Sequence, residues 1–161
     1  MKNSGTLRIT TPTEREVVVT RVFDAPRSLV FDAWTRPELL KRWLEAPGRS
    51  MAICEIDLKV GGAYRFLWKG PNKKDVGMYG VYREIVRPER IVRTESWEDW
   101  DAGESLVTVV LEERGGKTTF TETVLFPSRE VRDSVLESGL QQAAAVNFDR
   151  LAAHLATIRN A

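Results

Sequence analysis

The chain has 161 residues, of which 42% are hydrophobic and 29% are charged, and its formal net charge is +1 at pH 7. This balance is typical of a globular protein and argues against general binding to nucleic acids or membrane surfaces, which requires a basic face. A single cysteine, Cys54, and a single histidine, His154, exclude an internal disulfide, a cysteine-based metal site and a histidine pair for a metal. No segment has the roughly 18 apolar residues of a membrane span, and the N-terminus lacks the apolar core of a signal peptide. We therefore expect a cytoplasmic protein without membrane insertion, a nucleic-acid partner or a cofactor.

The first part of the chain predicts a tail, one strand and two short helices. Residues 1–14 are expected to form a flexible tail, and the stretch 15–24, rich in Val and Thr, predicts a strand. Pro26 suits the first turn of a short helix. The segment Thr35–Glu38 has the spacing of a capping box, which predicts that a second helix extends over residues 37–44.

From Ser50 onward the period of apolar residues changes to two, which is typical of β-strands. Gly61–Gly62 and Gly115–Gly116 indicate tight hairpins, and Pro88–Glu89 indicates a further turn. Six strands are expected, the first from residue 50 to the first hairpin and the others over 64–68, 76–86, 90–98, 105–113 and 117–126. Short connections make such a meander antiparallel, and one of its faces then needs a cover.

The last long segment, Ser128–Asn160, contains no proline and carries apolar residues at steps of mostly three and four, which predicts one amphipathic helix. Ser128 is expected to cap its N-terminus. This helix is the expected cover for the sheet. The chain is thus predicted to form a single α+β domain over residues 15–160. Its curved antiparallel seven-stranded sheet would wrap round the long C-terminal helix, in the order one strand, two helices, six strands and one helix.

Eight segments have a familiar order and spacing. They are Arg21–Pro26, Val30–Thr35, Pro37–Trp43, Gly61–Phe66, Gly80–Ile85, Pro88–Val92, Gly139–Leu140 and Phe148–Leu151. Together they resemble single-domain proteins of the activator of Hsp90 ATPase family, in the START/polyketide-cyclase-like (SRPBCC) superfamily. The resemblance implies the helix-grip fold, in which a curved sheet grips the last helix and a hollow remains between them. It does not fix an activity, because carriers, cyclases and co-chaperones share this scaffold.

Aromatic and apolar side chains fall on the faces predicted to point inward. By itself this pattern is typical of a packed core as well as of a cavity for a flat or lipid-like ligand, and the resemblance favours the cavity. Small residues around Ala144 leave volume under the helix, although alanine is also the best helix former. The residues expected to contact the ligand are Trp34, Trp43, Phe66, Trp68, Trp97, Phe120, Leu140, Ala144 and Phe148.

Arg93, Glu95 and Glu122 are charged at positions where the family often carries apolar residues. If the alternation holds, all three point inward and orient a polar part of the ligand, with Glu95 and Glu122 two strands apart. A carboxylate in an apolar hollow has a raised pKa unless a cation pairs with it, and it can act as a general acid or base. A slip of one residue would instead turn these side chains to water. The sequence leaves both arrangements open.

The leading hypothesis is that the protein binds a hydrophobic small molecule, lipid-like or aromatic, between the sheet and the last helix. One alternative is an enzyme of the cyclase or dehydratase type that uses an inward glutamate. Another is a co-chaperone-like module that binds a partner, although the chain lacks the separate N-terminal domain of the co-chaperone. A homodimer through an edge strand or the helix ends stays open. The sequence does not determine the ligand, any reaction or the oligomeric state.

Overall fold

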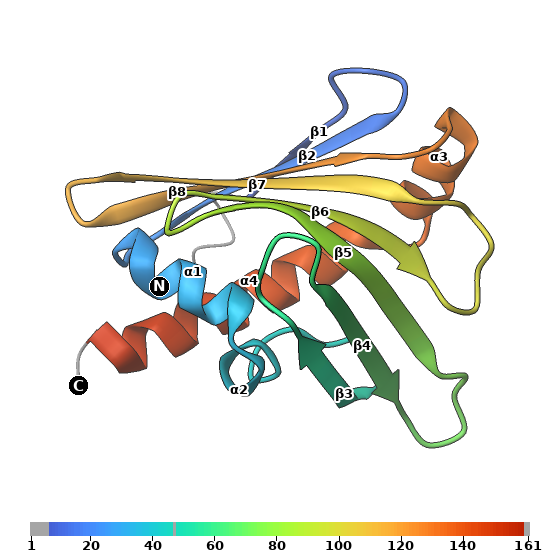
Figure 1. Cartoon of the computed structure of the whole chain (residues 1–161), viewed down its shortest axis with the longest axis horizontal. Coiled ribbons are helices and arrows are strands. Elements are labelled where there is room, and N and C mark those ends of the chain that lie inside the picture. The colour runs from blue at the N-terminus through green and yellow to red at the C-terminus, as the bar shows by residue number, and fades with distance from the viewer. Residues whose placement is uncertain (1–6, 47, 160–161) are drawn as a thin grey trace.

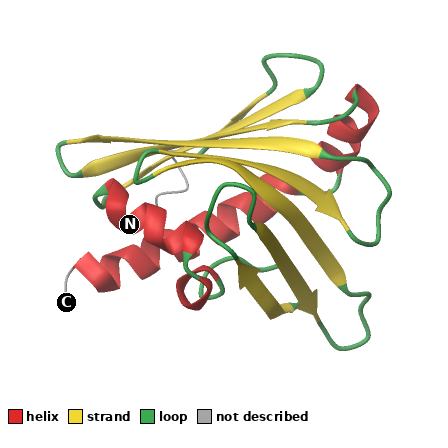
Figure 2. Ribbon diagram, in the orientation of Figure 1, coloured by secondary structure: helices red, strands yellow, loops and turns green. Residues whose placement is uncertain are grey.

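The computed structural model describes residues 7–46 and 48–159, and it consists of one sheet with helices packed on it (Figures 1 and 2). In chain order the elements are β1 (Arg8–Thr10), β2 (Glu16–Phe23), α1 (Arg27–Thr35), α2 (Pro37–Leu40), β3 (Ser50–Ile56), β4 (Ala63–Lys69), β5 (Val76–Val86), β6 (Arg90–Trp97), β7 (Ser105–Arg114), β8 (Lys117–Leu125), α3 (Arg129–Glu137) and α4 (Leu140–Arg159). The predicted α+β class is confirmed.

The strands form one sheet in the order β1-β2-β8-β7-β6-β5-β4-β3. Strands β3 to β8 pair in succession, as predicted for an antiparallel meander, and β2 pairs with β8 from Glu16 opposite Leu125 to Phe23 opposite Thr118. Figure 1 shows the sheet curving over α4, and Figure 2 shows α1, α2 and α4 on the same side of the sheet. The predicted grip of the sheet on the last helix is therefore confirmed.

Within the described residues the sheet has eight strands rather than the seven predicted. The additional strand, β1, lies in the segment predicted as a flexible tail, and its Ile9 pairs with Val19 of β2. Three residues are too few to show a period of two, so the sequence pattern gave no sign of this strand. It forms because the edge of β2 offers unpaired backbone groups, and Ile9 packs against the core. Residues 1–6 of the predicted tail lie outside the described residues.

The single C-terminal helix predicted over Ser128–Asn160 is wrong, because the structure divides it into α3 and α4. Gly139 lies between them with φ +95°, a left-handed conformation that glycine adopts without strain. The predicted cap is confirmed, since the Ser128 hydroxyl accepts a hydrogen bond of 3.2 Å from the Val131 amide. Asn160 lies outside the described residues.

The second short helix, α2, ends at Leu40 rather than at Leu44. The predicted capping box is also wrong, because the α2 N-cap is Arg36 and makes no side-chain cap hydrogen bond. Thr35 is buried in the last turn of α1, and its hydroxyl donates instead to the Phe31 carbonyl at 2.8 Å. Arg36, in an extended conformation, separates α1 from α2.

An aromatic cluster around Phe148 packs the middle of α4 onto the sheet. The Phe148 ring lies 6.0 Å from that of Phe23 and 5.2 Å from that of Phe120. The Trp34 ring of α1 stacks on Phe120 at 5.1 Å. Closer to the C-terminus of α4, Leu151 is also fully buried, so side chains fill the space between this part of α4 and the sheet.

An ion pair with a buried arginine joins the middle of α4 to β2. Arg21 Nη1 lies 3.0 Å from Asp149 Oδ1, and the Arg21 side chain has no exposed surface. The guanidinium also lies 5.4 Å from the centre of the Phe23 ring. A charge in this position requires a partner, so Asp149 fixes how α4 sits on the sheet.

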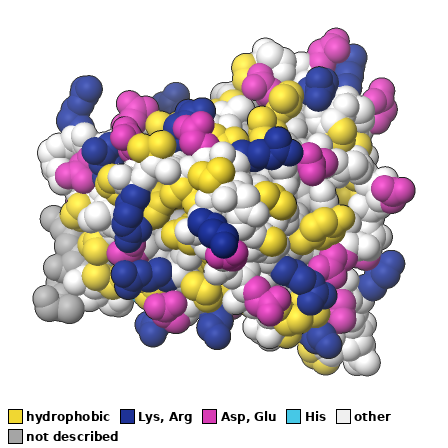
Figure 3. All heavy atoms as spheres, viewed as in Figure 1, with side chains coloured by type: hydrophobic (Ala, Val, Ile, Leu, Met, Phe, Trp, Pro, Cys, Tyr) yellow, Lys and Arg dark blue, Asp and Glu magenta, His cyan; other side chains and the backbone are white. Residues whose placement is uncertain are grey.

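The surface carries no large apolar face in the view of Figure 3, where apolar side chains alternate with charged ones. On the outer face of β5, Tyr79 and Val81 are exposed. Within residues 7–46 and 48–159, no helix is both long and apolar enough to cross a membrane.

We predict that Asp149→Ala lowers the free energy of unfolding by about 3 kcal/mol, because Arg21 stays buried without a counter-charge. Urea unfolding followed by circular dichroism measures the change. The matched control is Glu14→Ala, which removes one of the two acidic partners of Arg129, in an exposed pair with a distance of 3.9 Å. That change is expected to cost less than about 0.5 kcal/mol. Equal effects of the two substitutions would contradict the role given to Asp149.

Candidate functional site

A cavity of about 530 Å³ lies between the concave face of the sheet and the first half of α4. Its wall combines side chains of β2, β4, β5, β6 and β8 with side chains of α1, α3 and α4. Asp99, Trp100 and Ser138 line the cavity and are also exposed, so it opens to solvent between the β6–β7 connection and the junction of α3 and α4.

The hollow exists because α4 presents small side chains before Phe148 and large ones from Phe148 onward. Phe148, Leu151 and Leu155 are buried against the sheet and helices. One to two turns earlier, the residues of α4 that line the cavity include Ala143 and Ala144, which are too short to fill the space to the sheet.

Most of the predicted contact residues lie in the cavity wall. They are Trp34, Trp68, Arg93, Glu95, Trp97, Glu122, Leu140, Ala144 and Phe148. The structure places the other three, Trp43, Phe66 and Phe120, behind that wall, where each is fully buried. The Trp43 and Phe120 rings pack on Trp34, and the Phe66 ring packs on Trp68, so they support rings that do line the cavity.

The sequence interpretation missed several lining residues. Val17, Val19 and Val124 lie on the inward faces of β2 and β8, and the alternation with Phe23 and Glu122 was the signal that could have identified them. Strand alternation or helical spacing could also have identified Val76 and Met78 on β5, Val135 on α3, and Ala143 and Asn147 on α4. A further group comes from connections without a period, and no pattern could have identified these. They are Leu44, Glu45, Ala46, Arg49, Asp99 and Trp100.

Arg93, Glu95 and Glu122 all face the cavity, which is the inward arrangement of the two that the sequence left open. Strand β7 separates β6 from β8, and its Val109 lies opposite Glu122. Arg93 Nη2 lies 3.9 Å from Glu95 Oε1, with only 5% of the arginine side chain and 14% of the glutamate side chain exposed. These three charges therefore lie within protein, on one otherwise apolar wall.

The cavity raises the pKa of both carboxyl groups. Burial is the main cause for Glu95, where Arg93 opposes it. For Glu122, burial is again the main cause, Arg93 opposes it, and the like charge of Glu95 adds to it, so that the pKa reaches about 7. Glu122 therefore changes its charge near neutral pH, which an ordinary glutamate does not.

Aromatic side chains hold Arg93 in place. Its guanidinium lies 4.8 Å from the centre of the Tyr64 ring and 5.8 Å from that of Trp34. The Tyr64 hydroxyl donates to the Thr94 carbonyl at 2.5 Å, and burial raises the pKa of both Tyr64 and Tyr82. Both phenols therefore stay neutral, and Arg93 is the only cation on this wall of the cavity within the described residues.

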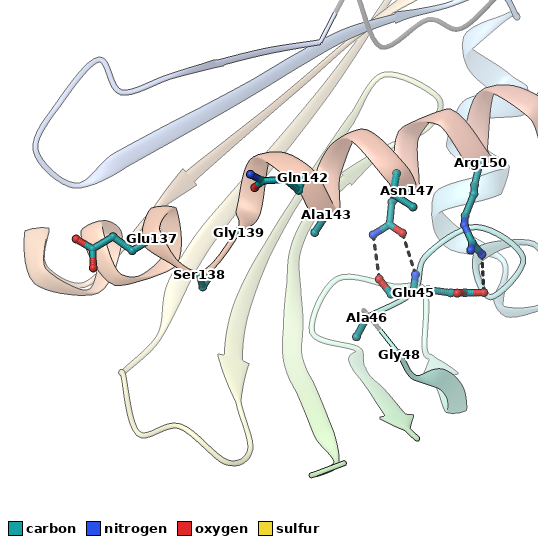
Figure 4. Close-up of a pocket in the computed structure, with 11 residues that line it drawn as sticks. Glu45, Ala46, Gly48, Glu137, Ser138, Gly139, Gln142, Ala143, Asn147 and Arg150 are labelled. Carbon is teal, nitrogen blue, oxygen red and sulfur yellow. Dashed lines mark hydrogen bonds and ion pairs between the residues drawn. The ribbon is translucent and has the colours of Figure 1, made fainter. Parts of the chain in front are cut away.

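Reciprocal hydrogen bonds tie the segment after α2 to α4 beside the cavity (Figure 4). The Asn147 side chain accepts from the Glu45 amide at 3.2 Å and donates to the Glu45 carbonyl at 3.1 Å. The Glu45 carboxylate in turn lies 2.7 Å from Arg150. A second hollow of about 470 Å³, whose lining residues Figure 4 draws, adjoins the cavity. The two share the lining residues Glu45, Ala46, Ser138, Gly139, Ala143 and Asn147.

Neither Cys54 nor His154 lines the cavity. Burial raises the pKa of the Cys54 thiol to about 11 and lowers the pKa of His154. Across the described residues, no group of three His, Cys, Asp or Glu side chains is placed to hold a metal ion. The chemistry of the site therefore rests on its carboxyl groups, Arg93 and the aromatic wall.

A family model described as activator of Hsp90 ATPase homolog 1-like protein matches residues 24–156. No curated protein matches the chain. Among solved structures, the crystal structure of a protein from Rhodobacter sphaeroides is 28% identical, with a TM-score of 0.88 over 94% of this chain and 99% of that chain.

Two further structures are similar in fold. The solution structure of a protein from Arthrobacter aurescens is 21% identical, with a TM-score of 0.84 over 94% of this chain and 92% of that chain. The crystal structure of a protein from Nitrosomonas europaea is 19% identical, with a TM-score of 0.82 over 94% of this chain and all of that chain.

We predict that Glu122→Gln stabilises the protein more at pH 8 than at pH 5. The folded-state pKa of about 7 lies above the ordinary 4.5, so the folded protein loses stability as pH rises from about 4.5 to 7. The neutral amide removes this loss, and the difference between the two pH values should be roughly 1–3 kcal/mol in urea unfolding. Glu112→Gln, at an exposed position of β7, should show no such difference. An equal effect of Glu122→Gln at both pH values would refute the raised pKa.

We predict that Asn147→Ala speeds hydrogen exchange at the Glu45 amide by about tenfold or more, because that amide loses its acceptor. Exchange followed by NMR measures the rate at this single position. Gln142→Ala, at an exposed position of the same helix, is the control and should leave the rate unchanged. Unchanged exchange in Asn147→Ala would show that other contacts hold the segment.

Proposed function

Because the chain belongs to the family of activator of Hsp90 ATPase homolog 1-like proteins, in the START-like superfamily, we propose that it binds a hydrophobic small molecule in the cavity under α4. The ligand is lipid-like or aromatic. Proteins of this family are known for ligand binding and for co-chaperone roles. The observation that carries the proposal is the cavity itself. Protein interiors are normally close-packed, so a hollow of about 530 Å³ supports a ligand that fills it.

The character of the wall supports a ligand with an apolar body. Trp34, Trp68 and Trp97 line the cavity together with the valines of β2 and β8. Pockets for small molecules generally have volumes of roughly 300–1,000 Å³, mostly apolar walls and a few polar groups that set orientation. Arg93, Glu95 and Glu122 would be those polar groups.

General acid–base catalysis by Glu122 is the second candidate function. The observation that favours it is a carboxyl group with a pKa of about 7 facing a cavity, because a group that titrates near the working pH can both accept and donate a proton. Native mass spectrometry separates the two functions. A carrier returns a co-purified molecule unchanged after incubation, whereas an enzyme converts it, and the conversion stops in Glu122→Gln.

We predict that the neutral fluorescent probe N-phenyl-1-naphthylamine binds to the wild-type protein with saturation and increased emission. Ala144→Phe places a large ring in the cavity and should weaken binding by about tenfold or more. Gln141→Phe adds the same ring at an exposed position of α4, and it should bind like the wild type. Absence of saturable binding, or equal affinities of all three proteins, would overturn the proposed cavity ligand.

A further inference from the structure

Among the described residues that line the cavity, acidic side chains outnumber basic ones. On the β6 and β8 wall, Glu95 and Glu122 face Arg93 alone. We propose that the ligand carries a positively charged nitrogen, an amine or ammonium group on an apolar body, and that this group lies against Glu122. The inference rests on the proposed function, because it names the chemical class of molecule that the cavity takes.

Arg93 is already engaged by other groups. It pairs with Glu95 at 3.9 Å, and its guanidinium packs on the rings of Tyr64 and Trp34. The Glu122 carboxyl makes no hydrogen bond or ion pair to any residue that the structure describes, although it faces the cavity. The carboxyl group without a partner is therefore the one that a ligand can satisfy.

The strands and helices around Glu122 place no second cation beside it within the described residues. Its neighbours in register are Val19 on β2 and Val109 on β7. Its charged and titratable neighbours are Arg93 and Glu95 on β6 and Tyr64 on β4. The residues of α3 and α4 that line the cavity are uncharged, and they are Val135, Leu140, Ala143, Ala144, Asn147 and Phe148. No described lining residue of these helices supplies the missing positive charge.

The charges at the mouth do not change this balance. Glu45 is paired with Arg150 at 2.7 Å. Arg49 donates from Nε to the Lys74 carbonyl at 2.8 Å, and Asp99 adds another negative charge. A positively charged ligand would thus approach through a mouth that does not repel it.

The aromatic wall fits the same ligand. Four tryptophans line the cavity, Trp34, Trp68, Trp97 and Trp100. Indole faces attract cations more strongly than other aromatic side chains do. Arg93 demonstrates this use inside the cavity, since its own charge lies on aromatic rings. A carboxylate ligand would instead meet two carboxyl groups, and a neutral ligand would leave the charge of Glu122 uncompensated.

The test compares three probes with the same naphthalene body, 1-naphthylmethylamine, 1-naphthylmethanol and 1-naphthoic acid. Isothermal titration calorimetry at pH 8 should give an affinity for the amine about tenfold or more above those of the alcohol and the acid. If the alcohol binds as well as the amine, this inference fails while the proposed function stands. If none of the three probes binds, and the neutral fluorescent probe does not bind either, both fail.

The pH dependence supplies a second readout with the wild-type protein. The probe is (1-naphthylmethyl)trimethylammonium, whose charge does not depend on pH. Its affinity should rise as pH increases through about 7, because Glu122 then becomes charged and attracts it. Glu122→Gln should remove both this rise and the preference for the amine over the alcohol. An affinity for the quaternary probe that is flat between pH 6 and pH 8 in the wild type would overturn the role of Glu122.

Discussion

The packing of Phe148 against Phe23 and Phe120 fixes α4 on the sheet, and the rest of the molecule depends on this contact. From Phe148 toward its C-terminus the helix fills the space above the sheet, and the buried pair of Arg21 and Asp149 sets its position there. An α-helix is stiff over twenty residues, so anchoring one half determines where the other half lies. The cavity thus begins at the part of α4 where large side chains no longer fill the space to the sheet.

The polar wall of the cavity is costly for folding. On the neighbouring strand β7, the buried inward positions are the apolar residues Val107 and Val109, which pack without bringing a charge into the interior. Arg93, Glu95 and Glu122 in the same layer bring charge into protein, and the raised pKa of Glu122 measures how poorly that carboxyl is compensated. Carboxyl groups with a raised pKa are common at functional sites, so this wall and the tryptophans around it are the best candidate for the functional part of the protein.

Sequence periodicity was sufficient for the elements that have one buried face. The strands from β2 to β8 and the inward direction of Trp68, Trp97 and Phe148 follow from alternation and helical spacing. It could not distinguish a ring that lines a cavity from one that lies behind it, as Trp43 and Phe120 show, because both kinds are apolar and inward. The tie between Glu45 and Asn147 was also beyond prediction, since it joins a loop backbone to a residue about a hundred positions away.

The break at Gly139 separates α4, which anchors on the sheet, from α3, which lies beside the mouth of the cavity. No side chain of α3 is fully buried, whereas α4 carries Phe148, Leu151 and Leu155 into the core. Val131, Val135 and Leu136 of α3 still pack against the core, but Arg129, Glu130, Ser134 and Glu137 are exposed. Substitutions at these exposed positions therefore change the surroundings of the mouth while leaving the buried contacts of α4 in place. Selection, or a protein engineer, can thus adapt the entrance to a longer or bulkier molecule at little cost in the free energy of folding.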